Sequence, residues 1–175
     1  MAAYDFSQIR SIVDVGGGEG ALLAAILAAN PPMRGIVFDL PHVLTGASAV
    51  LQRAGVTDRC QLVAGSFFET IPPGADAYIL KSIIHDWDDA AALAILRCCR
   101  IAIPDTGRLL LVEHALKPVN EPDPARFSDL NMLVMLGGQE REPDEFERLC
   151  AGAGFRLTAI VPTASTHSVI EARPV

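Results

Sequence analysis

Short apolar runs alternate with longer helix-forming segments along the first two thirds of the chain. Five of these runs predict strands, and the first of them is expected to be buried: 12–15, 35–39, 60–64, 77–81 and 108–113. Helices are predicted between them over 21–29, 43–54 and 90–103, the last of them capped by Asp88 or Asp89. This alternation predicts an α/β fold with a mostly parallel, doubly wound sheet.

The pattern changes after the fifth strand. Residues 117–124 contain three prolines and predict a surface loop. Two helices are expected over 127–136 and 143–153, separated by Gly137-Gly138. The last two apolar segments, 156–161 and 168–172, are joined by a polar turn and predict a hairpin that gives the sheet one antiparallel edge strand.

Four glycines within five positions follow the first strand and precede a helix. Such a turn lets a ligand approach the backbone closely, and Gly16-x-Gly18-x-x-Ala21 fits a dinucleotide-binding fingerprint. However, Asp14 and Glu19 flank the turn, and residues 11–33 contain no Lys or Arg. These carboxylates would repel a pyrophosphate. They suit S-adenosylmethionine, which carries a sulfonium and an ammonium, and an NAD-dependent oxidoreductase remains the alternative.

Other residues at strand ends extend this candidate cofactor site. Asp39 ends the second strand 23 positions after Gly16, close to the spacing at which a carboxylate binds ribose hydroxyls, although it could instead cap the following helix. Asp14 could cap the glycine turn or accept from the ammonium of the donor. After the third strand, Ser66 and Phe67 lie where an adenine is expected, with an ordinary core role as the alternative for Phe67.

The segment after the fourth strand contains a candidate general base, His85, which lies between a strand end and a helix start. The nearby helix N-terminus is expected to disfavour its protonated form, and a neutral imidazole is what a base for an acidic hydroxyl requires. Asp86, Glu113 or Glu140 could orient the ring. The other histidines are interpreted as surface or structural residues: His42, His114 and His167.

Composition narrows the functional class. The 175 residues are half hydrophobic, enough for one domain with one core, and the net charge of −7 without a Lys/Arg cluster argues against nucleic-acid binding. We find no signal peptide and no apolar run near the ~20 residues of a spanning helix, so a cytoplasmic protein without membrane contact is expected. The four cysteines lack C-x-x-C spacing, which favours buried free thiols over disulfides or a metal site.

Several motifs occur together in the order of a known family. The chain resembles the catalytic domain of S-adenosylmethionine-dependent O-methyltransferases of the caffeate, hydroxyindole and bacterial polyketide-tailoring type, from about Tyr4 to the C-terminus. The glycine turn is shared by all such methyltransferases, and the histidine and double-glycine motifs are more specific. The motifs are Val13-Asp14-Val15-Gly16-Gly17-Gly18-x-Gly20, Phe38-Asp39-Leu40-Pro41, Lys81-x-x-x-His85-Asp86-Trp87, Asp129-Leu130-x-Met132-Leu133 and Gly137-Gly138-x-Glu140-Arg141.

The resemblance implies a Rossmann-like class I methyltransferase that acts in secondary metabolism on a hydroxyl of a small aromatic or polyketide-like molecule, with S-adenosylhomocysteine as a product and without a metal. It implies that His85 is the general base and that Glu113 and Glu140 hold it. The implied donor-binding residues are Gly16, Gly18, Asp39 and Lys81, with Ser66 at the position of a family Asp. The implied acceptor-pocket residues are Asp86, Asp129, Met132 and Met135.

Two departures from the family pattern qualify these expectations. The family has Gly-Asp after the third strand, where this chain has Gly65-Ser66, so weaker donor binding is expected. The family also carries an N-terminal helical domain that forms a homodimer and closes the acceptor pocket. Residues 1–175 are expected to be the single catalytic domain without it, so that this chain alone is poorly active. A donor-binding relative without methyl transfer and a purely interacting fragment remain alternatives.

Overall fold

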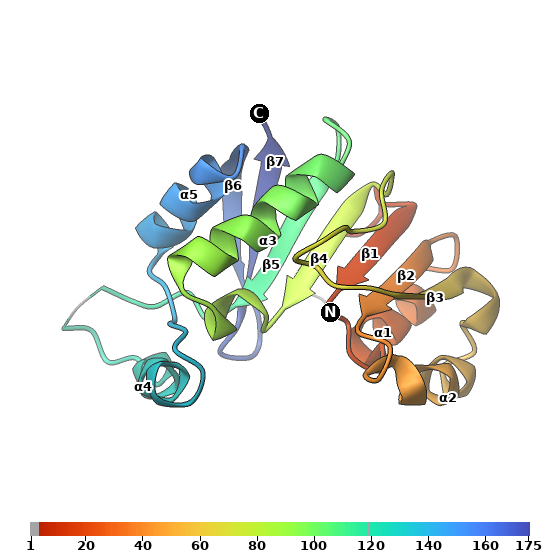
Figure 1. Cartoon of the computed structure of the whole chain (residues 1–175), viewed down its shortest axis with the longest axis horizontal. Helices are drawn as coiled ribbons and strands as arrows, with labels where there is room; N and C mark the ends of the chain where they lie inside the picture. Colours follow the sequence, from red (N-terminus) through yellow and green to blue (C-terminus); the bar gives the residue numbers. More distant parts are fainter. Residues whose placement is uncertain (1–3, 119) are drawn as a thin grey trace.

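The computed structural model describes residues 4–118 and 120–175. The expectations for residues 1–3 and for Val119 in the proline-rich loop lie outside this range. Seven strands form one sheet in the order β3-β2-β1-β4-β5-β7-β6 (Figure 1). The strands are β1 (Ser11–Val15), β2 (Arg34–Asp39), β3 (Cys60–Ala64), β4 (Ala77–Lys81), β5 (Arg108–Glu113), β6 (Phe155–Pro162) and β7 (Ser168–Pro174).

The first five strands are parallel, and their order reverses between β1 and β4. Strands β2 and β3 extend the sheet on one side of β1, whereas β4 and β5 extend it on the other. In open α/β sheets, ligands bind at such a reversal, outside the carboxyl ends of the strands. The register aligns these ends, since Val15 pairs with Phe38 and Lys81 pairs with Val112.

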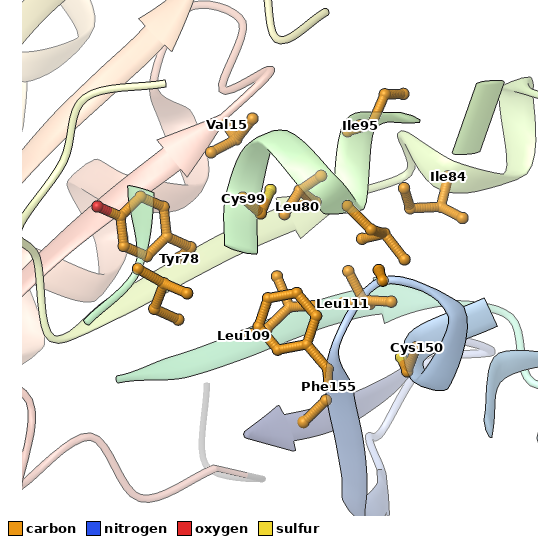
Figure 2. Close-up of a cluster of buried hydrophobic side chains, with 14 of the residues drawn as sticks. Val15, Tyr78, Leu80, Ile84, Ile95, Cys99, Leu109, Leu111, Cys150 and Phe155 are labelled. Carbon is orange, nitrogen blue, oxygen red and sulfur yellow. The ribbon is translucent and has the colours of Figure 1, made fainter. Parts of the chain in front are cut away.

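Helices cover both faces of the sheet. On one face, α1 (Ala21–Ala29) and α2 (Ala47–Arg53) pack on alternate strand residues that include Ile79 and Leu110. On the other, α3 (Asp89–Ala102) and α5 (Pro143–Gly152) cover Tyr78, Leu80 and Leu111 (Figure 2). The central strands β1, β4 and β5 are covered by helices on both faces, which explains why their sequences are almost continuously apolar. Helix α4 (Ala125–Met135) stands apart from the sheet, at the lower left of Figure 1.

The expected elements form with small shifts at their ends. The helix predicted over 43–54 divides into the 3₁₀ helix η1 (Leu44–Gly46) and α2. Asp88 is the cap of α3, because its side chain accepts from the Ala91 N–H at 2.8 Å. Strand β7 is antiparallel to both neighbours and lies between β5 and β6, so the predicted hairpin forms this edge of the sheet.

Two further expectations concerned the state of the cysteines and the presence of membrane-spanning helices. All four cysteines are free thiols, and Cys60, Cys99 and Cys150 are buried, as expected. Cys98 is only half-buried, because it lies on the outer side of α3 near the carbonyl of Glu69. Among the described residues, no helix has the length and apolarity needed to cross a membrane.

Candidate active site

The glycine turn after β1 is anchored to the end of β2. The Gly16 and Gly17 amides donate to the Phe38 carbonyl at 2.8 and 3.3 Å. Gly16 has φ +71° and Gly18 has φ +60°, which side chains rarely adopt. A Cβ on Gly16 would meet the Ile83 side chain at 2.5 Å, whereas a Cβ on Gly18 would point into open space. The turn therefore exposes bare backbone at Gly18.

A cavity of about 470 Å³ lies against this turn, between the ends of β1 and β4. Its volume is typical of a small-molecule site. Lys81, at the exposed end of β4, brings one cation to this otherwise acidic cavity. The structure therefore gathers several residues predicted to bind the cofactor: Asp14, Gly16, Gly18 and Lys81.

Asp39 holds the glycine turn in place. Its Oδ2 accepts from the Gly18 amide at 2.8 Å, and its Oδ1 accepts from the Leu40 amide at 2.7 Å. Each carboxylate oxygen can accept a second hydrogen bond, so the predicted contact with ribose hydroxyls is compatible with this geometry. Ser66 has a local role, because its hydroxyl accepts from the Phe68 amide at 3.2 Å and closes the turn after β3.

Asp14 is a buried acid that faces the cavity. It is 2% exposed, and its Oδ2 has no hydrogen-bond partner among the described residues. Burial, with a smaller contribution from the negative charge of Asp39, raises the pKa of Asp14 to about 7. An orphaned buried oxygen is costly in a folded protein. This observation supports the ligand-binding alternative for Asp14 over a purely structural cap.

Aromatic side chains border the same turn. Phe67 is half-buried, and one edge of its ring would lie 3.5 Å from a Cβ on Gly16. Phe68 is exposed and packs edge-on against Trp87, with ring centroids 4.8 Å apart. Phe67 lies beside the glycine turn and packs on the hydrophobic core, so the structure shows the core role that was the alternative for it. Its contact with an adenine stays a prediction.

The second part of the site is a histidine surrounded by three acids. His85 lies in the 3₁₀ helix η3 (Ile84–Asp86), and its side chain is 13% exposed. Its Nδ1 is 3.1 Å from Glu140 Oε1 and 3.6 Å from Glu113 Oε2, and its Nε2 is 3.3 Å from Asp86 Oδ1. Both glutamate side chains are fully buried. The structure therefore brings together all three predicted catalytic residues.

The surrounding carboxylates shift the pKa of His85 in the direction opposite to the one expected. Burial lowers the pKa of His85, but the hydrogen bond to Glu140 and the charges of Glu113, Glu140 and Asp86 outweigh it and raise the pKa above its ordinary value. The expectation that a helix N-terminus keeps the ring neutral was wrong, because three carboxylates lie nearer. Such a ring is a strong base that loses its proton only as pH rises.

Glu113 supports the segment that carries His85. Its Oε1 accepts from the backbone amides of Ile83 and Ile84 at 3.0 and 2.8 Å. Burial raises the pKa of Glu113 to about 7, against the opposing effect of His85. His85, Glu113 and Glu140 also have ligand atoms within 4.8 Å of one another, as a metal site would. The expected absence of a metal therefore stays a prediction.

The predicted acceptor residues on α4 are placed differently from one another. Asp129 accepts from the Glu140 amide at 2.9 Å and so fixes the backbone beside the base. Met132 is half-buried, whereas Met135 is 74% exposed. Asp86 lies 3.3 Å from the Nε2 of His85, where an acceptor hydroxyl would bind. Acceptor binding by these four residues stays a prediction.

Sequence reasoning missed two residues of this site. Ser128 donates to Glu140 Oε1 at 2.8 Å, and Arg141 is 1% exposed and bonded to the segment after β4. The double-glycine motif was a usable signal for Arg141, whereas nothing local marked Ser128. The histidines interpreted as surface or structural include a half-buried stacked pair, His114 and His167, with ring centroids 4.1 Å apart.

Fold and site together define an enzyme class. A doubly wound sheet with a glycine-turn cavity at its switch point is typical of proteins that bind adenosine-type cofactors, and a buried cluster of a histidine and two acids, here from η3, the end of β5 and the segment between α4 and α5, is suited to proton abstraction. Residues 1–156 match the family model described as the O-methyltransferase domain, and the chain belongs to this family.

Individual relatives agree with this assignment. The chain is 50% identical to the phenazine O-methyltransferase of Lysobacter antibioticus over 173 residues, 99% of this chain and 51% of that protein. A mitomycin 7-O-methyltransferase structure shares 40% identity and a TM-score of 0.94, covering 99% of this chain and 51% of the other.

An O-methyltransferase from neocarzinostatin biosynthesis, solved with S-adenosylhomocysteine and 1,4-dihydroxy-2-naphthoic acid, shares 38% identity and a TM-score of 0.92, covering 99% of this chain and 52% of the other. The chain therefore has the Rossmann-like class I methyltransferase fold, with its mostly parallel sheet. It spans about half the length of the curated relatives it matches.

Proposed function

We propose that this chain is the catalytic domain of an S-adenosylmethionine-dependent O-methyltransferase, which methylates a hydroxyl of a small aromatic or polyketide-like molecule. The observation that carries the proposal is that His85 and its two buried glutamates belong to the same edge of the sheet as the glycine-turn cavity: Lys81 lines the cavity, and Ile83, two residues before His85, packs against Gly16. The cavity and the segment that carries His85 follow the carboxyl ends of the neighbouring parallel strands β1 and β4, so a donor in the cavity and an acceptor at His85 would meet.

The donor half of the proposal rests on the charges around the cavity. Asp14 presents an orphaned carboxylate oxygen that an ammonium group would satisfy, and Asp39 lies at the end of β2 for the ribose. Gly16 and Gly18 keep the backbone bare, and Phe67 and Ser66 border the adenine side. A solved relative bound to S-adenosylhomocysteine supports this ligand class. When bound, the donor supplies an electrophilic methyl group on a sulfonium sulfur.

The chain contributes positioning and proton removal. The acceptor hydroxyl gives its proton to His85 Nε2 while its oxygen forms the new bond to the methyl carbon, and the electrons of the broken carbon–sulfur bond remain on sulfur. Glu140 and Glu113 stabilise the imidazolium through Nδ1. Alignment of oxygen, methyl and sulfur supplies most of the acceleration, and the base adds roughly 10²–10⁴-fold.

Nε2 must be accessible for this step, and Asp86 bears on that access. Its Oδ1 is 3.3 Å from Nε2, at the edge of the ring where the acceptor would arrive. Asp86 is half-buried and lies at the end of a short 3₁₀ helix, so its side chain can turn aside. An acceptor hydroxyl then takes its place, with Asp86 as a hydrogen-bond partner for the acceptor.

The acceptor class and the assembly extend the proposal to the full-length protein. Relatives named for phenazine and crystallised with a naphthoic acid support a flat aromatic acceptor. We propose a cytoplasmic homodimer without nucleic-acid or membrane partners, in which residues outside this chain cover α4 and close the acceptor pocket. Helix α4 leaves a row of exposed apolar side chains that supports such a partner surface: Phe127, Leu130, Leu133, Val134, Met135 and Leu136.

Calorimetric titration of this chain with S-adenosylhomocysteine, with NAD as the control ligand, tests the proposal. We expect binding of the first and none of the second. Binding of NAD would assign the cavity to an oxidoreductase cofactor. If neither ligand binds, Ser66→Asp separates a weakened site from a wrong assignment, since the restored carboxylate should recover binding only in the first case.

A further inference from the structure

Arg141 is a buried cation with a full set of hydrogen bonds. It is 1% exposed, and a guanidinium in such a place is costly unless its N–H groups are paired. Nε and Nη2 donate to Asp89 Oδ1 at 3.0 and 2.8 Å. Nη1 donates to the carbonyls of Ile84 and Gln139 at 3.0 and 3.4 Å, and Nη2 donates to the carbonyl of Trp87 at 2.9 Å. These five contacts match the five donors of an arginine.

These bonds hold the segment that carries His85. The Ile84 and Trp87 carbonyls lie on either side of the histidine, and the His85 carbonyl itself accepts from the Gln139 amide at 2.9 Å. Gly138 permits this approach, because a Cβ there would collide with the His85 carbonyl oxygen. Glu113 binds the amide groups of the same segment and Arg141 binds its carbonyl groups, so the segment is held by opposite charges.

The backbone of Arg141 reaches a third segment. Its carbonyl accepts from the Leu116 amide at 2.9 Å, and Ala115 and Arg141 form an isolated parallel bridge. Ala115 and Leu116 come just after Glu113 in the sequence. Arg141 therefore joins three stretches that are far apart in sequence and that carry His85, Glu113 and Glu140.

We propose that Arg141 is a positioning residue, which holds Glu140 against the Nδ1 of His85 by fixing the distance between their two segments. Glu140 precedes Arg141 in the chain, so a shift of the Arg141 backbone moves the carboxylate that lies 3.1 Å from Nδ1. The consequence for methyl transfer rests on the proposed function. The positioning itself is a property of the unliganded chain.

The test is an NMR titration of the His85 ring in the 175-residue chain, which needs neither donor nor acceptor. Arg141→Lys keeps the charge but loses the planar set of donors. We expect the His85 pKa to fall in Arg141→Lys toward its value in Glu140→Gln, and the double variant to titrate like Glu140→Gln alone. The charged groups that face the ring are Glu113, Glu140 and Asp86, and none of them is itself replaced in Arg141→Lys.

The matched control is Arg148→Lys. Arg148 is an exposed arginine on α5 whose carboxylate partner, Glu145, is 3.9 Å away, so its replacement should leave the His85 titration unchanged. Hydrogen exchange adds a local readout. The Gln139 amide should exchange faster in Arg141→Lys, while amides shared between β1 and β2 should keep their protection, since a purely global loss of stability would speed both.

Some outcomes contradict the proposal. It fails if folded Arg141→Lys titrates like the parent chain, or if the double variant shows a further fall beyond Glu140→Gln. If Arg141→Lys does not fold, Asp89→Ala decides, because Asp89 is 73% exposed and its Oδ1 accepts two of the five bonds, which alanine cannot replace. It should shift the His85 pKa in the same direction by less. An unshifted pKa in a folded Asp89→Ala chain would overturn the assignment.

Discussion

The donor side and the base side of the site are built in different ways. On the donor side, Asp14, Gly16 and Gly18 lie within one short stretch, and backbone amides bonded to Phe38 and Asp39 shape the turn. On the base side, His85, Glu113 and Glu140 come from three distant segments held together by buried charged side chains. The glycine turn is therefore encoded by one contiguous stretch of sequence, whereas the cluster of His85, Glu113 and Glu140 forms only once the sheet has brought the three segments together.

The two sides also differ in how the charge of their buried carboxylates is compensated. Asp14 has an oxygen without a partner among the described residues, and its pKa is raised because burial and the charge of Asp39 outweigh the opposing effect of Lys81. On the base side, one oxygen of Glu140 already accepts from His85 and Ser128, which lower the pKa of Glu140 despite its burial. The Oε2 atoms of Glu113 and Glu140 also have no hydrogen-bond partner among the described residues, but these acids lie beside His85, which supplies a cation when it takes a proton. On the donor side, a ligand ammonium group would take that role.

The largest expected effect separates the two sides by activity. In the full-length parent, His85→Ala should lower methyl transfer by roughly 10²–10⁴-fold, since the base is lost, and leave the affinity for S-adenosylhomocysteine unchanged. Turnover assays and calorimetry measure the two quantities. His42→Ala, at an exposed position, is the control and should preserve both. An equal loss of donor binding in His85→Ala would place the histidine on the donor side instead.

A pair of glycine substitutions should separate the sides by structure. Gly138→Ala places a Cβ against the His85 carbonyl and 2.5 Å from the Asp86 carbonyl carbon, neither of which can yield easily. We expect a loss of about 1–3 kcal/mol in the free energy of unfolding, measured by denaturant titration, with S-adenosylhomocysteine binding retained in the folded protein.

Gly18→Ala is its counterpart on the donor side. Its Cβ meets no protein atom within 4 Å, so its cost in the free energy of unfolding comes only from the positive φ and amounts to roughly 1–2 kcal/mol. This Cβ points toward the cavity, so S-adenosylhomocysteine binding should be lost. If Gly138→Ala abolishes ligand binding and Gly18→Ala preserves it, the division of the site into two sides is wrong.

The smallest expected effect is a pH dependence on the donor side. Burial raises the pKa of Asp14 to about 7 in the unliganded protein, and the ammonium group of the ligand pairs with the ionised form of Asp14. Affinity for S-adenosylhomocysteine should therefore rise about tenfold between pH 6 and 8, and Asp14→Asn should remove that part of the slope. Calorimetry at three pH values measures it, and a slope that persists in Asp14→Asn would assign the titration to another group.

The raised pKa of Asp14 also makes the free energy of unfolding depend on pH. Its folded-state pKa lies above its ordinary value of 3.8. The stability that the protonated form contributes is therefore complete below about pH 4 and is lost as pH rises through about 7. Glu113, with a pKa also raised to about 7, acts in the same direction. Asp14→Asn should flatten the first contribution and leave the second.

Sequence revealed most of the fold because the signals were local. The five parallel strands were predicted to within a residue or two. The central ones are buried and therefore nearly continuous apolar runs, whereas the edge strand β3 is mostly exposed. The glycine turn and Asp39 were recognisable because their spacing follows from one strand–turn–helix unit. The order of the two hairpin strands in the sheet was not predicted. It depends on whether β6 or β7 pairs with β5, and no local sequence pattern determines that pairing.

The base side was predictable only in its residue types. His85 was recognised from its place between a strand and a helix, and the two glutamates from their motifs. Its pKa was misjudged because the distances to three carboxylates depend on how distant segments meet. Ser128 and the structural contact of Asp129 were hidden for the same reason, since both act on Glu140 from α4.

The place of β7 has a consequence for how the chain is made. Strand β5 pairs with β4 on one side and with β7 on the other, and β7 contains the last strand residues of the chain. During synthesis, the edge of β5 therefore stays unpaired until Ser168–Pro174 has emerged. An open apolar strand edge promotes pairing with other chains. This edge of the sheet is therefore protected from aggregation only after β7 has been synthesised, however early the first five strands fold.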